Sequence, residues 1–120
     1  MTLVYVDTNI FMDFLEGRNK KAFTFFMRAI SCEFTILISD IVLFELKKQG
    51  FDFSALCSWL DKKLSITACT SEDKKFGRTL PTHYADGLHA AIAQRHKADV
   101  FLSGDKGFSF LKNHVTLDDI

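Results

Sequence analysis

The stretch Leu3-Val4-Tyr5-Val6-Asp7-Thr8-Asn9 decides the fold of this 120-residue chain. Its first four residues are apolar or aromatic without alternation, which is typical of a strand buried on both faces in a parallel sheet. Ligands of open α/β sheets bind beyond the carboxyl ends of such strands, where Asp7 is expected. Thr8 or Asn9 is expected to cap the helix that follows. Taken alone, Asp7 is better explained by a simple helix-opening role, so the rest of the chain must decide.

Predicted strands alternate with predicted helices along the rest of the chain. After residues 3–6, unbroken apolar or β-branched runs predict strands at residues 34–38, 64–68, 99–102 and 115–117. Helical spacing of apolar residues predicts helices at residues 10–16, 22–30, 41–46, 53–64, 71–80, 82–96 and 106–111. This order predicts an α/β fold: one three-layer α/β/α domain over residues 1–120, with a mainly parallel central sheet.

Two of these helices, residues 22–30 and 82–96, show a clear apolar face. The residues expected to face the core are Phe23, Phe26, Met27 and Ile30 in the first and Ala85, Leu88, Ala91 and Ile92 in the second. The chain has thirteen phenylalanines, more large rings than 120 residues are expected to bury completely. Some of these rings are therefore candidates for a protein–protein surface, and a homodimer is expected.

Composition narrows the class of protein and its partners. The formal net charge is zero, so binding to a nucleic acid would have to come from local basic patches. Three cysteines, Cys32, Cys57 and Cys69, match no C-x-x-C spacing and indicate free thiols in a reducing cytosol. No basic, apolar leader or membrane-spanning run is evident, so a cytoplasmic protein without a membrane partner is expected. Glycine-rich nucleotide-binding motifs are absent from the sequence.

Four carboxylates interrupt apolar surroundings at positions where a parallel sheet would bring them together. Asp7 and Asp105 follow predicted strands, and Glu45 and Asp86 lie near predicted helix starts. Converging carboxylates repel one another, and a hard divalent cation such as Mg²⁺ or Mn²⁺ relieves that repulsion. Such sites carry out phosphoryl chemistry by activating a water and stabilising the leaving oxygen. The pattern predicts a divalent-metal site suited to phosphoryl chemistry.

Each acid also has a purely structural interpretation. Asp7 and Asp105 could be helix caps, and Asp86 could interact only with the dipole of its helix. Glu45 is harder to explain in this way, because it lies between Phe44 and Leu46 and a buried acid needs a partner. The histidines at 83, 89, 96 and 114 have no zinc-like spacing and are interpreted as surface or core residues.

Four motifs in this order resemble PIN domains, and most closely the small VapC-like toxin ribonucleases of toxin–antitoxin modules. The first is Val-Asp-Thr-Asn-Ile-Phe at residues 6–11, and the second is Ile-Ser-Asp-Ile-Val-Leu-Phe-Glu-Leu at residues 38–46. The third is Asp-Gly-Leu-His-Ala-Ala at residues 86–91, and the fourth is Phe-Leu-Ser-Gly-Asp-Lys-Gly-Phe at residues 101–108. Gly87 departs from the pattern, since the family often has a larger residue there and glycine weakens a helix start.

The resemblance implies a function and a set of site residues. Asp7, Glu45 and Asp86 would hold Mg²⁺ or Mn²⁺, with Asp105 as a further acidic ligand or water-orienting group. Asn9 and Ser103 match polar positions that line the family's site. The implied reaction is metal-dependent hydrolysis of RNA, and the implied partner is an antitoxin protein. The residues expected to contact RNA phosphates are Arg18, Lys20, Lys21, Lys47 and Lys48.

Two other functions remain open at this stage. One is a PIN-like RNA-binding or scaffold module with little catalytic turnover. The other is a receiver-like domain that accepts a phosphoryl group. A receiver-like domain needs an acceptor aspartate on a middle strand, and the predicted strand at residues 64–68 has none.

Overall fold

The computed structural model describes residues 2–120, except for the side chains of Leu56, Cys57 and Asp61. Its strands are β1 (Thr2–Val6), β2 (Phe34–Ser39), β3 (Leu64–Thr67), β4 (Val100–Leu102) and β5 (His114–Val115). Its α-helices are α1 (Thr8–Leu15), α2 (Lys20–Ile30), α3 (Asp40–Lys48), α4 (Ser54–Leu60), α5 (Ser71–Gly77) and α6 (Tyr84–Arg95). Two short 3₁₀ helices complete the secondary structure, η1 (Asp61–Lys63) and η2 (Lys106–Phe108).

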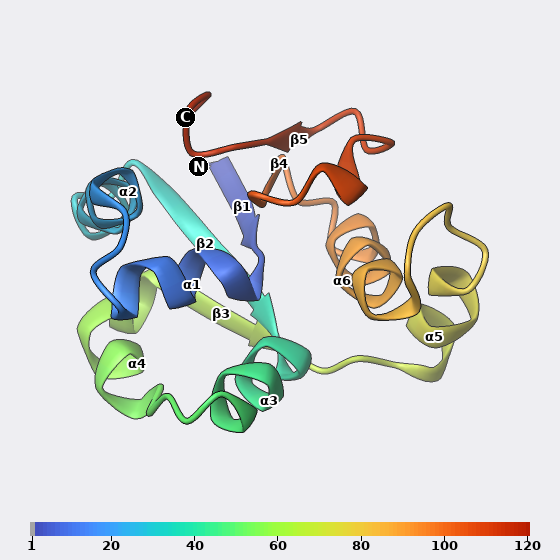
Figure 1. Ribbon diagram of the computed structural model, residues 1–120, viewed down its shortest axis with the longest axis horizontal. Helices are drawn as coiled ribbons and strands as arrows, with labels where there is room; N and C mark the ends of the chain where they lie inside the picture. The colour runs from blue at the N-terminus through green and yellow to red at the C-terminus, as the bar shows by residue number, and fades with distance from the viewer. Residues whose placement is uncertain (1) are drawn as a thin grey trace.

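The strands form one parallel sheet in the order β3-β2-β1-β4-β5, with β1 at its centre (Figure 1). Val4 of β1 is aligned with Ile36 on one side and Val100 on the other. The chain leaves β1 toward β2 and later returns to β4 on its opposite side. Because the order reverses at β1, the carboxyl end of this strand is the expected position of a ligand crevice. The predicted α/β fold with a parallel sheet is confirmed.

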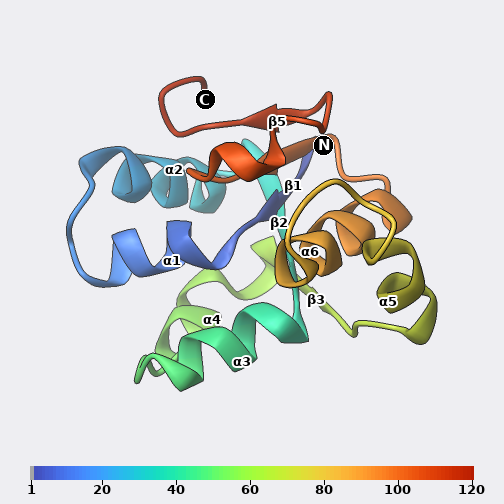
Figure 2. The same cartoon turned by 45° about the vertical axis from the view of Figure 1, so that its right-hand side comes forward.

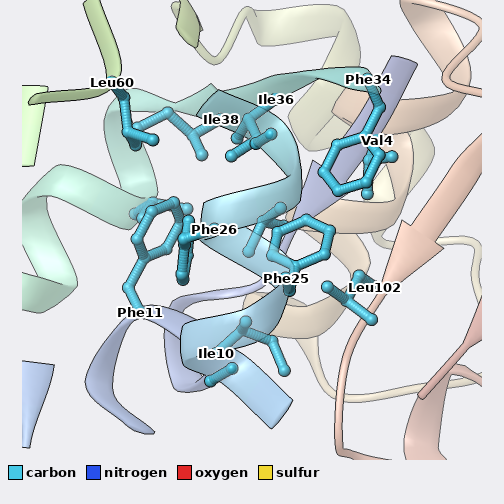
Figure 3. Packing of buried hydrophobic residues seen from close by; sticks show 14 of the residues in the cluster. Val4, Ile10, Phe11, Phe25, Phe26, Phe34, Ile36, Ile38, Leu60 and Leu102 are labelled. Atoms are coloured by element: carbon cyan, nitrogen blue, oxygen red, sulfur yellow. The ribbon is translucent and has the colours of Figure 1, made fainter. Parts of the chain in front are cut away.

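Alternating side chains of β1 fill two separate cores, one on each face of the sheet. Val4 and Val6 pack with Phe26 of α2 and other buried residues under α1 to α4, as Figure 3 shows for Val4 and its neighbours. Tyr5 points to the opposite face and packs with Phe101 and with alanines of α6. In Figures 1 and 2 the helices α1 and α2 lie on one side of the strands, and α5 and α6 on the other. These are the three predicted layers.

The expected core-facing residues of α2 are partly wrong. The buried residues are Ala22, Phe25, Phe26 and Ala29, whereas Phe23 is 53% exposed and stacks on Phe14 of α1. In α6, Ala91 and Ile92 are buried as predicted, but Ala85 is exposed. The reason is the same in both helices: more than one face carries apolar residues, and the neighbouring helix decides which face is covered.

Most predicted elements are present, but several are shorter than predicted. The helix predicted at residues 53–64 ends at Leu60 and continues as η1, and the helix predicted at residues 106–111 is only the 3₁₀ turn η2. Helix α5 ends at Gly77, four residues before Pro81, where its backbone lies against Gly87 of α6.

Helices α5 and α6 touch through their glycine backbones. A Cβ atom added to Gly87 would lie 2.4 Å from the carbonyl oxygen of Gly77, which is closer than real Cβ contacts. Gly87 therefore has a structural role beyond its weak helix propensity, since the close contact of the two helices requires a glycine at this position. That contact sets the position of the first turn of α6, which carries Asp86.

The described cysteine side chains are free thiols: Cys32 is exposed and Cys69 is partly buried. The prediction for Cys57 concerns a side chain outside the described residues. Within the described part of the chain, no helix is long and apolar enough to cross a membrane.

Candidate active site

The carboxyl edge of the sheet carries all four predicted acids. Asp7 follows β1, Glu45 lies in α3 after β2, Asp86 is in the first turn of α6, and Asp105 follows β4. Asp7, Glu45 and Asp86 line one cavity of about 970 Å³ together with Asn9. Asp105 does not line this cavity, although its charge acts on Asp86.

Asp7 is held at the floor of the site by two donors. Its side chain is almost fully buried, with the backbone N–H of Thr8 donating to Oδ1 at 2.8 Å and Ser103 Oγ donating to Oδ2 at 2.9 Å. Asp7 itself, and not Thr8 or Asn9 as expected, is the N-cap of α1. Burial raises the pKa of the Asp7 carboxyl and the nearby Glu45 adds to the rise, while His89 and the two donors oppose it.

Glu45 is oriented by two side chains that contact the same oxygen. His89 Nε2 lies 2.8 Å from Oε1, and Thr8 Oγ1 donates to Oε1 at 2.7 Å. Burial would raise the pKa of the Glu45 carboxyl, but these hydrogen bonds outweigh it and hold the pKa below its ordinary value. Glu45 is therefore an ionised acceptor at neutral pH, with 34% of its side chain exposed.

His89 connects this carboxylate to the interior of the protein. Its ring is 1% exposed, and its Nδ1 lies 2.6 Å from the hydroxyl oxygen of Tyr5. The Tyr5 hydroxyl lies 2.9 Å from Oγ of Ser39, which is also fully buried. Nε2 of His89 is also 3.9 Å from Oδ1 of Asp7. A continuous polar chain thus runs from the end of β2 through β1 and α6 to the acid in α3.

Asp86 and Asp105 form the more open side of the site. Asp86 is half-buried, and its pKa is raised by this burial and by the charges of Asp105 and Asp7. Asp105 is exposed and caps η2, where Oδ1 accepts the N–H of Gly107 at 2.8 Å. The backbone N–H of Asp105 donates to Ser103 Oγ at 3.0 Å, so Ser103 links Asp105 to Asp7.

The donor chemistry fits a hard divalent cation, but the side chains do not form a finished ligand set. The candidate ligands are carboxylate oxygens, and the raised pKa of Asp86 arises partly from like charges that a cation would neutralise. Within residues 2–120, however, no group of three or more His, Cys, Asp or Glu side chains is arranged to hold a metal ion. Binding would require these carboxylates to close around the cation.

The predicted cationic residues lie in different places. Lys48 lines the cavity, and so does Lys74 of α5, which the sequence analysis did not select. Arg18 pairs with Asp13 and Glu16 of α1, and Lys21 pairs with Asp118. Lys20 and Lys47 are exposed, and the cavity lining does not include these four residues.

Sequence reasoning also missed Thr8, Tyr5 and His89 as parts of the site. The signal for His89 was its spacing, because a residue three positions after Asp86 lies about one turn further along the same helix. The signal for Tyr5 was its position two residues before Asp7, since side chains two positions apart in an extended chain point to the same face of the sheet. The contact of His89 with Glu45, and that of Tyr5 with His89, follow only from the packing of α6 beside β1 and α3.

No protein-family model matches the sequence, and no curated protein matches it. Several solved structures have a similar fold over almost the whole chain. One is the VapBC2 complex of Rickettsia felis bound to a promoter DNA fragment, with a TM-score of 0.69 and 19% identity over 96% of this chain and 97% of that chain. A toxin–antitoxin complex from Klebsiella pneumoniae has a TM-score of 0.71 and 20% identity over 95% of this chain and 97% of that chain. VapC20 of Mycobacterium tuberculosis, a sarcin–ricin-loop-cleaving toxin, has a TM-score of 0.63 and 13% identity over 89% and 93%.

Proposed function

We propose that this chain, which has the fold of the VapC-type PIN-domain toxins, is a metal-dependent endoribonuclease and the toxin of a toxin–antitoxin pair. The observation that carries this proposal is the cavity at the carboxyl edge of the sheet, where Asp7, Glu45 and Asp86 meet. One buried acid and two partly buried acids line the same cavity. Helix capping alone does not explain why three acids gather there. Their repulsion is a cost that binding of a cation removes.

Asp7, Glu45 and Asp86 would hold Mg²⁺ or Mn²⁺, with Asp105 beside them as a further acidic group. When bound, such a cation activates a water and neutralises the charge that develops on the phosphate. The protein's own contribution is orientation: Ser103 and the N–H of Thr8 hold Asp7, while His89 and Thr8 hold Glu45. The buried position of Asp7 keeps bulk water away from one side of the site.

The rim of the cavity supports RNA as the substrate. Lys48 and Lys74 line it and can contact phosphates, and the ring of Phe44 is 67% exposed on the same cavity. Exposed aromatic rings beside cationic residues are the usual means by which proteins bind single-stranded nucleic acid. Arg18, Lys20, Lys21 and Lys47 are candidates for contacts with RNA that extends beyond the cavity.

A protein partner is the second part of the proposal. The solved structures with this fold include toxin–antitoxin complexes, and this chain exposes aromatic side chains on α2 and α4. Phe14 stacks on both Phe23 and Trp59, and the latter two are 53% and 41% exposed. We propose that the exposed rings of Phe23 and Trp59 contact an antitoxin or a second copy of the chain. We also propose that the protein acts in the cytoplasm, where its RNA substrate would be found.

Cleavage of RNA under controlled metal conditions tests the proposed function. A panel of structured and unstructured RNAs is incubated with the protein in Mg²⁺, in Mn²⁺ and in chelator. Asp7→Asn is the site variant. Asp13→Asn is the matched control, because Asp13 lies in the same region of sequence but outside the cavity. Metal-dependent cleavage that Asp7→Asn abolishes and Asp13→Asn retains is the expected result.

Two other results would contradict the proposed enzyme. Cleavage that persists in chelator or in Asp7→Asn would show that the activity does not arise from this site. Tight RNA binding without cleavage in either metal would instead support an RNA-binding module with little turnover. Asp7→Asn retains an oxygen acceptor for the N–H of Thr8, so its folding is expected to be preserved.

A further inference from the structure

We propose that Tyr5 and His89 are positioning residues: the Tyr5 hydroxyl fixes the imidazole tautomer of His89 so that Nε2–H holds Glu45 in place. This inference deepens the proposed function and rests on it only for the consequence in catalysis. The arrangement itself stands on four side chains from four elements: Ser39 at the end of β2, Tyr5 in β1, His89 in α6 and Glu45 in α3.

The direction of each hydrogen bond follows from the chemistry of its two ends. The Glu45 carboxylate can only accept, so His89 must donate to it from Nε2 across the 2.8 Å contact. With a single ring proton on Nε2, Nδ1 is an acceptor, and the Tyr5 hydroxyl donates to it across the 2.6 Å contact. The oxygen of Tyr5 then accepts from Ser39 Oγ at 2.9 Å. All three donors point toward Glu45.

The surroundings keep this chain rigid. Tyr5 is fully buried, and its ring stacks on Phe101 at a centroid distance of 5.2 Å and an angle of 13° between the planes. Within the described residues, no buried side-chain N or O atom lacks a hydrogen-bond partner. Removing the Tyr5 oxygen would leave both Ser39 and Nδ1 of His89 without this partner.

The consequence for the site is that α6 and α3 are tied together through the centre of the sheet. Glu45 is 34% exposed, so without His89 its side chain would be free to turn toward solvent. Thr8 alone would then restrain it, through its single hydrogen bond to Oε1. Removal of a group that hydrogen-bonds to a metal ligand and orients it typically lowers metal affinity or activity by about 10- to 100-fold.

The experiment compares Tyr5→Phe with Tyr84→Phe. The chain has only these two tyrosines, and Tyr84 is 42% exposed at the start of α6 and outside the polar chain. The ¹⁵N NMR spectrum of the imidazole nitrogens is recorded on the metal-free native protein and on both variants. Mn²⁺ affinity and the kcat and KM for RNA cleavage are then measured for the same three proteins.

The expected spectrum of the native protein and of Tyr84→Phe shows a protonated Nε2 and an unprotonated Nδ1 at His89. In Tyr5→Phe the signal of Nδ1 shifts, because it loses its donor. Mn²⁺ binding and kcat are expected to fall by about 10- to 100-fold in Tyr5→Phe, with little change in KM and no change in Tyr84→Phe. The unchanged KM reflects a cavity rim that the substitution does not alter.

Three results would overturn the proposal. The first is a native His89 with its proton on Nδ1, or with protons on both nitrogens. The second is a Tyr5→Phe protein with native Mn²⁺ affinity and native kcat. The third is an equal loss in Tyr84→Phe. If the native protein cleaves no RNA, the proposed function fails, while the spectrum and the Mn²⁺ affinity still decide on the positioning residues. The spectrum of the native protein also decides if Tyr5→Phe does not fold.

Discussion

At the scale of single residues, the carboxylates of the site repel one another. Asp86 has a raised pKa because it is partly buried and because Asp105 and Asp7 lie near it. The folded protein therefore binds the Asp86 proton more tightly than the unfolded chain does. The contribution of Asp86 to stability is fully present at pH below its ordinary pKa and is lost as the pH rises through the raised value. At neutral pH the ionised carboxylate destabilises the metal-free protein.

Asp86→Asn is accordingly expected to raise the melting temperature of the metal-free protein at pH 7, by a few degrees. The amide is nearly the same size and removes one charge from the cluster. The gain should shrink as the pH is lowered and should vanish below about pH 4, where both side chains are uncharged. Thermal unfolding of both proteins from pH 3.5 to pH 8 in chelator measures it. A variant that is less stable than the native protein at pH 7 would show that the charges are not in conflict.

At the scale of the elements, the contact between α5 and α6 depends on two glycines. Substitution of Gly87 by Ala would improve helix propensity by about 1 kcal/mol. The added methyl group would collide with the carbonyl of Gly77, however, and an overpacked contact of this kind costs about 1–3 kcal/mol. Backbone cannot move aside as a flexible side chain can.

Gly87→Ala is therefore expected to lower the free energy of unfolding by up to about 2 kcal/mol, and to reduce activity because Asp86 shifts with α6. Gly104→Ala is the control, because nothing lies within 4 Å of a Cβ at that position. Urea denaturation of the two variants gives the free energies. A Gly87→Ala protein that is more stable than the native protein by about 1 kcal/mol, the full gain in helix propensity, would mean that the two helices separate without cost.

The sequence predicted the strands well because each is a continuous apolar run, and a buried parallel strand requires such a run. It predicted the faces of the helices less well. Phe23, Phe25 and Phe26 cannot all point to the sheet, and their spacing does not say which ring the neighbouring helix covers. The acids were identifiable from their apolar surroundings at strand and helix ends. The hydrogen-bonded side chains that connect Ser39 to Glu45 through Tyr5 and His89 were not identifiable. Their successive contacts join residues 34, 84 and 44 positions apart in the sequence, which only the packed structure brings together.

At the scale of the whole molecule, a bound cation should act as a clamp. Asp7 caps α1, Glu45 lies in α3 and Asp86 lies in α6. An ion bound by all three acids would therefore connect both layers of helices. Mn²⁺ is expected to raise the melting temperature of the native protein at pH 7. A ligand at 100 times its Kd adds about 2.7 kcal/mol of stability.

The shift should be reversed by chelator and should be small in Asp7→Asn. Thermal unfolding at increasing Mn²⁺ concentration measures it, and Asp13→Asn serves as the control that keeps the site intact. A melting temperature that does not respond to Mn²⁺ in the native protein would exclude a metal that these three acids hold together.

The strand order has a consequence for the chain during its synthesis on the ribosome. The central strand β1 is made first, yet one of its two neighbours, β4, is made almost last. Asp7 and Glu45 can come together early, but Asp86 joins them only after α6 has been made, and Asp105 only when the final fifth of the chain has emerged. A nascent chain with the ribonuclease activity proposed above would thus lack part of its acidic site while the ribosome is still translating it.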